Sequence, residues 1–187
     1  MSTCVMLNEK EIISQVLNGD LKVYELLIKE YEKLVYLVIS RLVTNKEDAE
    51  DICQEVFMKV YKNLSSFSFQ SKLSTWIARI AYNTSINYLK KYKGIEMSEQ
   101  PADINSFHFT NDNPETQLAK KDHAAYIHQL INQMPVQFKT VITLYHLYEF
   151  SYQEIEDITG MPDGTVKSYL FRARKLLKEK LEVYLKD

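Results

Sequence analysis

The fold is decided by one segment, SYQEIEDITGMPDGTVKSYLFRARKLLKEKL, which runs from Ser151 to Leu181. Ser151 and Glu154 have the spacing of a capping box, in which each side chain bonds the other residue's backbone N–H, so a short helix is expected over 151–159. Gly160 suits a left-handed helix end and the proline that follows shortly after cannot continue a helix, which predicts a stop there. A second helix is expected over 163–183.

The second helix has one apolar face and one basic face. Spacings of four, three and four residues align Val166, Leu170, Ala173 and Leu177 along its inner face. Residues 164–180 hold six lysines and arginines against one acid. A short helix, a glycine turn and a longer basic helix are typical of a helix-turn-helix, whose second helix enters the major groove of DNA. The alternative is an αα-hairpin with a solvated basic face, but the charge density favours DNA binding.

The composition indicates an all-α protein of a reducing compartment. The 187 residues allow one large domain or two small ones, and 45% hydrophobic residues are enough for real cores. Four glycines and four prolines indicate few turns. Cys4 and Cys53 are too few for a disulfide framework, and Cys53 falls on a predicted buried helix stripe. Apolar runs are too short to cross a bilayer and the amino terminus lacks the form of a signal peptide, so we expect a cytoplasmic protein without membrane insertion.

Two small helical domains joined by a flexible linker are expected. The linker, residues 94–112, has no helical period and is rich in Ser, Asn, Asp and Pro. The first domain, residues 1–93, should contain helices over 8–17 and 21–43, a third that opens at Asn45, and a fourth from about residue 75. The second domain, residues 113–187, should begin at the cap-like sequence Asn113-Pro114-Glu115 and contain helices over 114–133, 136–149, 151–159 and 163–183.

Charge is divided sharply along the first domain. Residues 47–55 hold five acids and no base, whereas residues 56–95 hold seven lysines and arginines and no acid. Asp48, Asp51 and Glu55 recur about once per turn on one face of the expected third helix. Asp51 and Glu55 lie beyond the first turn, so the positive end of the helix dipole does not account for them. This face therefore indicates a surface that binds a basic protein partner.

A loop and the helix after it combine cations with aromatic and amide side chains. The loop over 65–74 carries Phe67 and Phe69, which both look exposed. One side of the following helix carries Arg79, Tyr82, Asn83, Ile86 and Lys90. This mixture suits single-stranded nucleic acid, because cations follow the phosphates while rings stack on unpaired bases. Packing in the core is the alternative, which we expect for Trp76 but not for Phe67.

Four motifs together resemble one protein family. They are DAEDICQEVF (Asp48 to Phe57), SSF with STWIARIAYNTSINYL (Ser65 to Leu89), NPE (Asn113 to Glu115) and MPDGTVKSYLFRARKLL (Met161 to Leu177). In this order and spacing the chain is similar, over nearly its whole length, to bacterial sigma factors of the extracytoplasmic-function (ECF) group. The resemblance implies a sigma region 2-like domain and a region 4-like helix-turn-helix domain. It also implies that the chain binds core RNA polymerase and directs it to promoters.

The resemblance assigns a role to each group of residues. Binding to the β′ clamp helices of core RNA polymerase is implied for Asp48, Asp51, Gln54 and Glu55. Recognition and melting of the minus-10 element are implied for Phe67, Arg79, Asn83 and Lys90. Recognition of the minus-35 element is implied for Thr165, Lys167, Ser168, Phe171, Arg172 and Lys175. The polymerase β flap and an anti-sigma factor are further partners that the resemblance implies.

Three positions depart from the family pattern. After its first phenylalanine the loop has Ser68-Phe69-Gln70 instead of the common Arg-Gly-acid sequence, which bears on the identity of the melted bases. Tyr169 stands where the family often has arginine, which implies one phosphate contact fewer. Leu73 replaces a usual phenylalanine.

Two other classes of function are weighed against a sigma factor. A helix-turn-helix regulator that acts without replacing sigma would carry a receiver or ligand-binding domain in front, and residues 1–93 show no parallel-strand runs for one. An enzyme would need a catalytic or metal motif, but no glycine-rich phosphate loop is present. No H-x-x-x-H pair is formed by any of the four histidines, His108, His123, His128 and His146. We therefore expect no enzymatic activity, cofactor or metal.

Overall fold

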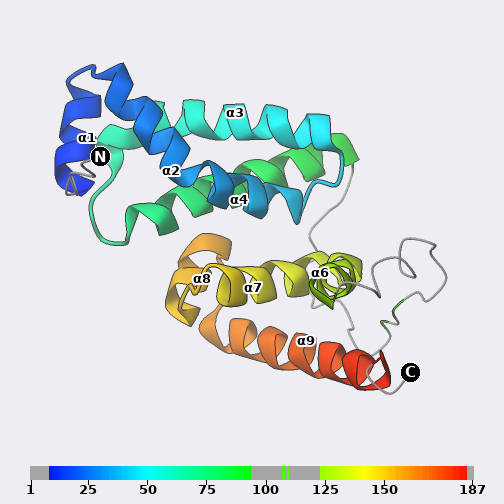
Figure 1. Ribbon diagram of the computed structural model, residues 1–187. Helices are drawn as coiled ribbons and strands as arrows, with labels where there is room; N and C mark the ends of the chain where they lie inside the picture. Colours follow the sequence, from blue (N-terminus) through cyan, green and yellow to red (C-terminus); the bar gives the residue numbers. More distant parts are fainter. Residues whose placement is uncertain (1–8, 94–106, 108, 110–122, 185–187) are drawn as a thin grey trace, which may run out of the picture. The chain divides into compact units, whose positions relative to one another are not determined.

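The computed structural model describes residues 9–93, 107, 109 and 123–184 (Figure 1). All the secondary-structure elements within these residues are helices, which confirms the all-α fold. The chain divides into two compact units, residues 1–93 (unit 1) and residues 94–187 (unit 2). Most of the expected linker, and the expected cap at residues 113–115, lie outside the described residues.

Over residues 9–93, unit 1 is built from four α-helices and one short 3-10 helix. They are α1 (Glu9–Leu17), α2 (Leu21–Ser40), α3 (Lys46–Asn63), η1 (Leu64–Ser66) and α4 (Leu73–Lys93). Asp20 caps α2 by accepting hydrogen bonds from the backbone N–H groups of Lys22 and Val23. Asn45 caps α3 in the same way by accepting from the N–H of Asp48. Both helices therefore begin where short polar side chains satisfy N–H groups that have no partner within the helix.

The three long helices of unit 1 pack against one another in pairs (Figure 1). Their shared core consists of fully or almost fully buried aliphatic side chains, among them Val35, Ile39, Val56, Val60 and Ile77. Removing this apolar surface from water is the main favourable contribution to the stability of such a bundle. The packing leaves the outer faces of α3 and α4 available for other contacts.

Residues 123–184, the continuous described part of unit 2, form four further helices. They are α6 (His123–Gln133), α7 (Val136–Leu147), α8 (Tyr152–Thr159) and α9 (Asp163–Tyr184). The predicted capping box is present, since Ser151 Oγ accepts from the Glu154 N–H while the Glu154 carboxylate accepts from the Ser151 N–H. Gly160 ends α8 with φ at 75°, the left-handed conformation that favours glycine. The sequence thus correctly predicts the helix-turn-helix formed by α8 and α9.

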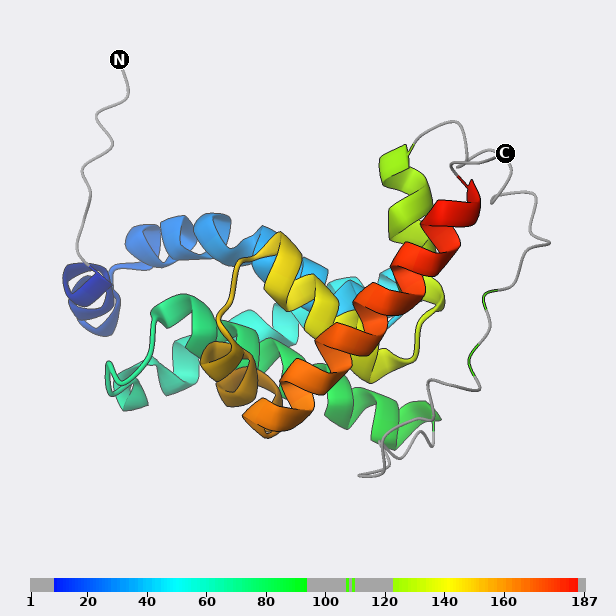
Figure 2. The same ribbon diagram turned by 90° about the horizontal axis from the view of Figure 1, so that it is seen from below.

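The basic helix α9, orange to red in Figure 2, packs its apolar face on α7 and α8. Val166, Leu170 and Ala173 are buried as predicted, whereas Leu177 is only half-buried. Tyr169 joins this core, because its side chain is 6% exposed and its ring stacks on Phe138 with 4.4 Å between centroids. The position that often holds arginine in the family is therefore a packing position in this protein.

Among the described helices, none is long and apolar enough to span a bilayer.

Candidate functional site

The outer face of α9 carries the residues predicted to contact DNA. Lys167, Arg172 and Lys175 are exposed, and Thr165 and Ser168 are half-buried at its edge. Phe171 is 69% exposed in the middle of this basic face. An exposed apolar ring among cations contributes little to the stability of the fold, but it can contact a thymine methyl group in the major groove. The face therefore combines exposed cations, which suit phosphates, with an exposed apolar ring, which suits a base edge.

Lys167 is held at the start of α9 by two neighbours. Its ammonium forms an ion pair with Asp163 one turn earlier and lies 5.5 Å from the centre of the Tyr152 ring on α8. The bond to Asp163 raises the pKa of Lys167, so the ammonium stays charged at neutral pH. These contacts place a cation at the end of the helix that approaches base edges in helix-turn-helix complexes.

A second cation on α9 is tied to α7 in a way that the sequence did not predict. The Arg174 Nε–H donates to His146 Nε2 over 3.0 Å, and the guanidinium lies 4.8 Å from the centre of the Tyr145 ring. Tyr145 in turn stacks on Tyr152 with 5.2 Å between centroids. Burial, followed by the charge of Arg174, lowers the pKa of His146, which keeps its imidazole neutral and able to accept the bond. The cluster fixes α7, α8 and α9 beside the basic face.

On α4, the predicted DNA-binding residues fall into two groups. Arg79, Asn83 and Lys90 are exposed as predicted. Tyr82 and Ile86, which were placed on the same side, are 5% and 9% exposed and belong to the core. The polar face of α4 is therefore narrower than predicted, because α4 is covered on more than one side by α2 and α3.

The expectation that Phe67 is exposed is wrong. Its side chain is 6% exposed, and its ring packs against Trp76 and Phe69 with centroids 5.4 and 4.8 Å away. Phe67 follows η1 directly, where its N–H donates to the Leu64 carbonyl and turns the ring inward. Trp76 is half-buried in this cluster, in agreement with the expected packing role. Phe69 is the exposed aromatic residue of the loop, at 45%.

The acidic face of α3 is present, but one of its residues, Asp48, already has a hydrogen-bond partner inside the protein. Asp51, Gln54 and Glu55 are exposed. Asp48 is half-buried and accepts a hydrogen bond from the Tyr88 hydroxyl of α4, and this bond raises the pKa of Tyr88 to about 12. Glu55 forms an exposed ion pair with Lys59 at 2.7 Å, which is weak in water and can exchange for an external cation.

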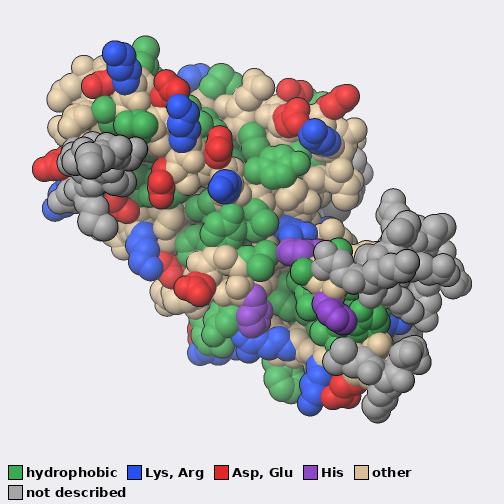
Figure 3. All heavy atoms as spheres, in the orientation of Figure 1, with side chains coloured by type: hydrophobic (Ala, Val, Ile, Leu, Met, Phe, Trp, Pro, Cys, Tyr) green, Lys and Arg blue, Asp and Glu red, His purple; other side chains and the backbone are tan. Residues whose placement is uncertain are grey.

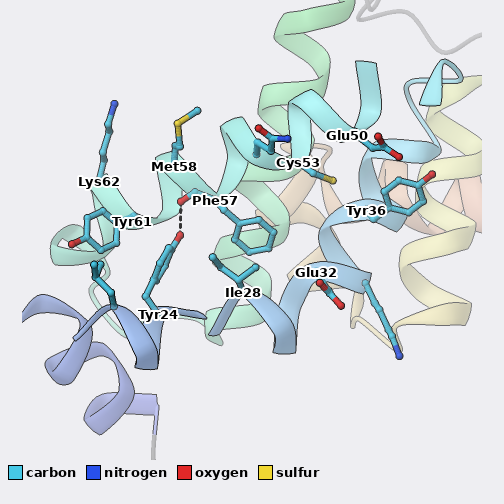
Figure 4. Close-up of a pocket in the computed structure, with 13 residues that line it drawn as sticks. Tyr24, Ile28, Glu32, Tyr36, Glu50, Cys53, Phe57, Met58, Tyr61 and Lys62 are labelled. Carbon is cyan, nitrogen blue, oxygen red and sulfur yellow. Dashed lines mark hydrogen bonds between the residues drawn. The ribbon is translucent and has the colours of Figure 1, made fainter. Parts of the chain in front are cut away.

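A groove of about 950 Å³ lies beside this acidic face, between α2 and α3 (Figure 4). Ile28 and Phe57 line it from the two helices, and the Tyr24 hydroxyl donates to the Phe57 carbonyl across it. The exposed large apolar side chains along it are Leu21 (65%), Tyr36 (41%), Met58 (56%) and Tyr61 (41%). In the space-filling view, hydrophobic side chains come to the surface in this region with charged side chains beside them (Figure 3).

This groove was not predicted from the sequence. The signal was available, since Met58 and Tyr61 are large apolar residues outside the buried stripe of their helix. Cys53, expected in the core, is half-buried and lines the groove. Burial raises the pKa of the Cys53 thiol to about 11, so it is protonated at neutral pH and a poor nucleophile.

Comparisons with known proteins agree with this arrangement. Residues 27–94 match the sigma-70 region 2 family and residues 124–177 match the sigma-70 region 4 family. The chain is 30% identical over 186 residues to the RNA polymerase sigma-H factor of Pseudomonas aeruginosa, covering 96% of each chain. It is 32% identical over 183 residues to the ECF RNA polymerase sigma-E factor of Haemophilus influenzae, covering 94% of this chain and 96% of the other.

A solved structure shows the same fold. The sigma factor RpoE of Bartonella quintana, crystallised with the anti-sigma factor NepR, superposes with a TM-score of 0.62 at 23% identity, over 87% of this chain and 98% of that one. The chain therefore belongs to the ECF sigma factors of the sigma-70 family, with region 2 in unit 1 and region 4 in unit 2. It functions in promoter-directed initiation of transcription by RNA polymerase.

Proposed function

We propose that the two units divide promoter recognition: unit 1 binds core RNA polymerase and opens the minus-10 element, and unit 2 recognises the minus-35 element. The observation that carries this proposal is the separation of exposed charge. Acids occupy the outer face of α3, whereas cations occupy the outer faces of α4 and α9. Opposite charges suit a protein partner at the first face and phosphates at the other two.

Binding to the β′ clamp helices is assigned to Asp51, Gln54 and Glu55, since their side chains are exposed along α3. Asp48 is assigned an indirect role. Because its carboxylate already accepts from Tyr88, it joins the first turn of α3 to α4 and fixes the acidic face relative to the DNA-binding helix.

The groove between α2 and α3 is proposed as the site for an amphipathic helix of an anti-sigma factor. Apolar side chains would enter between Phe57, Met58 and Tyr61, as in other helix-in-groove complexes. Gln54 belongs both to the groove and to the acidic face. An occupant of the groove would therefore exclude the clamp helices, which is the effect required of an anti-sigma factor.

Promoter DNA is assigned to the exposed polar residues of α4 and α9. On α4, Arg79, Asn83 and Lys90 would follow the opened minus-10 strand, with cations on phosphates and the amide on a base. On α9, the minus-35 element would be contacted by Thr165, Lys167, Ser168, Phe171, Arg172 and Lys175. With α9 in the major groove, the side chains on its exposed face would reach the edges of the bases.

We assign the protein no catalytic step of its own, since core polymerase performs nucleotide addition. Its place of action is the cytoplasm, where bacterial polymerase and DNA meet. The linker between the domains would let the two units contact elements at different distances along the promoter.

The test is transcription in vitro from a library of host genomic fragments with purified core polymerase. Addition of the chain should produce specific transcripts whose upstream DNA shares a minus-35 and a minus-10 sequence. A control protein with Arg172 and Lys175 changed to alanine retains the polymerase-binding face but should lose most of these transcripts, because two of the cations assigned to the minus-35 element are missing. If specific transcripts arise only when another sigma factor is also present, the protein acts as a regulator and the proposal is wrong.

A further inference from the structure

Arg174 on α9 is held in a different way from the lysines of the same helix. Lys167 and Lys175 each form an ion pair with an acid one turn away on α9. Arg174 is held by two neutral groups of α7 instead: its Nε–H donates to His146 Nε2 over 3.0 Å, and its guanidinium lies 4.8 Å from the centre of the Tyr145 ring. No acid takes part in these contacts, so the positive charge of Arg174 remains available to an external anion.

Arg174 lies in line with side chains that are assigned to the minus-35 DNA. Lys167, Phe171 and Arg174 are spaced four and three residues apart, which places them along one side of the helix. All three are exposed. In helix-turn-helix complexes the start of the second helix meets the base edges. Arg174 comes two turns after Lys167, and this position favours a contact with the DNA backbone.

Two stacked tyrosine rings, from α7 and α8, contact the cations of this line. The centroids of Tyr145 and Tyr152 lie 5.2 Å apart at an interplanar angle of 20°. Lys167 lies over the Tyr152 ring and Arg174 over the Tyr145 ring. A guanidinium that lies over a ring and donates through Nε can still bind a phosphate through its two terminal amino groups. The contacts therefore restrict the long Arg174 side chain without using the donors that a phosphate needs.

We propose that His146 is a positioning residue for promoter binding: it holds the Arg174 guanidinium on the Tyr145 ring, where the terminal amino groups bind one phosphate of the minus-35 DNA. This inference rests on the proposed function of unit 2. It adds a cation of α9 and two side chains of α7 that the sequence did not assign to DNA binding. Because Arg174 is ordered before the DNA arrives, less side-chain entropy is lost when the complex forms.

The experiment uses the full-length chain bound to core polymerase and a set of matched variants. Arg174→Ala removes the cation. His146→Leu removes the hydrogen-bond acceptor, whereas His146→Gln keeps a side-chain oxygen that can accept from the Arg174 Nε–H. His128→Leu makes the same change at an exposed histidine of α6 and is the control. Denaturant unfolding checks that the variants keep their fold, which is expected because His146 and Arg174 are exposed.

The probe is a promoter duplex found by transcript mapping. On this duplex Arg174→Ala should weaken binding by about tenfold, the lower end for loss of a hydrogen bond to a charged group. His146→Leu should weaken binding by roughly two- to tenfold, the effect of ordering one long side chain. His146→Gln should restore most of that loss. The double variant of Arg174→Ala and His146→Leu should bind as Arg174→Ala does, because no guanidinium is left to position.

A second set of duplexes carries one uncharged methylphosphonate at a time in place of a minus-35 phosphate. At one position the original protein, Arg174→Ala and His146→Leu should bind alike, because the phosphate contact is then missing from all three complexes. At the other positions the differences should remain. A purely structural role of His146 would weaken binding on every duplex.

Four outcomes would overturn the inference while leaving the proposed function intact. They are unchanged binding by His146→Leu, an equal loss for His128→Leu, a His146→Leu loss that persists on every duplex, and additive losses in the double variant. The last of these would make His146 a separate DNA contact. If the original holoenzyme binds equally well to a duplex with a scrambled minus-35 sequence, the proposed function of unit 2 fails as well.

Discussion

Arg172 and Lys175 lie three residues apart on the exposed face of α9, yet their chemistry differs. A guanidinium can form two hydrogen bonds to guanine in the major groove, whereas an ammonium acts as a point charge toward phosphate. Lys175 lies 3.9 Å from Glu179 in an exposed pair, which is weak enough to exchange for a phosphate.

Arg172→Ala should therefore cost about 1–3 kcal/mol at the preferred minus-35 sequence and relax discrimination there. Lys175→Ala should weaken binding about equally on all sequences and lower the salt dependence by roughly one counterion. Binding to single-base variants of the minus-35 element at two salt concentrations measures both effects. A uniform loss for Arg172→Ala across the panel would show that it contacts phosphate.

Phe67 and Asn83, which the sequence grouped together, should behave differently in the same assays. Phe67→Ala removes a buried ring and should lower the free energy of unfolding by about 3–5 kcal/mol. Asn83→Ala changes an exposed side chain, so stability should stay within about 0.5 kcal/mol while strand opening slows.

Denaturant unfolding and the kinetics of strand opening separate the two residues. On a promoter already mismatched across the minus-10 element, much of the Asn83→Ala defect should disappear, because the bases need no longer be unpaired. An equal defect on both templates would mean that Asn83 does not act through strand opening.

At the scale of elements, the turn between α8 and α9 depends on one glycine. Gly160 has φ at 75°, and a Cβ added there would meet no atom within 4 Å. Gly160→Ala should therefore destabilise the protein by roughly 1–2 kcal/mol, a purely conformational cost of the left-handed region.

Gly164 provides the matched control, because it lies within α9 and its added Cβ also meets open space. Gly164→Ala should be stabilising by about 0.5–1 kcal/mol, since alanine loses less backbone entropy in a helix. Denaturant unfolding of both variants of the full chain tests the pair. Equal effects at the two positions would contradict the assigned turn.

The helices were predictable because their signals are local. Asp20, Asn45 and the Ser151–Glu154 box each satisfy backbone N–H groups of the helix that they begin, and Gly160 ends the helix before it. Phe67 was not predictable in this way, because a loop has no period that distinguishes an inward ring from an outward one. Its burial depends on the contact with Trp76, which lies in the next helix, α4, and which the loop sequence does not place.

Surfaces formed by two packed helices also could not be predicted from the sequence. The exposed side of α3 follows from its period, but the groove requires knowledge that α2 packs alongside it. The same holds for Tyr169, whose position between inner and outer faces of α9 was settled by the Phe138 ring on α7. Arg174 and His146 likewise meet only after α7 and α9 have packed.

At the scale of the whole molecule, the formal net charge of −2 conceals the opposed charged faces on which the proposed function depends. Changing Asp51 and Glu55 to lysine should weaken competition for core polymerase by at least about tenfold, because like charges would then face the clamp helices. The fold should be retained, since both side chains are exposed. A competition assay against a labelled sigma factor measures the change.

The control is the double change of Glu11 and Glu30 to lysine, at exposed acids outside the acidic face of α3. Each double variant replaces two negative charges with two positive ones, so both shift the formal net charge from −2 to +2. Normal competition by the control, with weakened competition by the α3 variant, would locate the effect on α3. Equal weakening would show a general effect of charge and contradict the assignment.

The stacked pair of Tyr169 and Phe138 limits which side chains position 169 can accept without loss of packing. An arginine at position 169 that reaches a phosphate must leave the space between α7 and α9 that the tyrosine ring now fills. Such a substitution gains attraction for DNA and loses packing, so affinity and stability move in opposite directions. An arginine at position 169 would therefore need a compensating change in the core to keep the stability of the present protein.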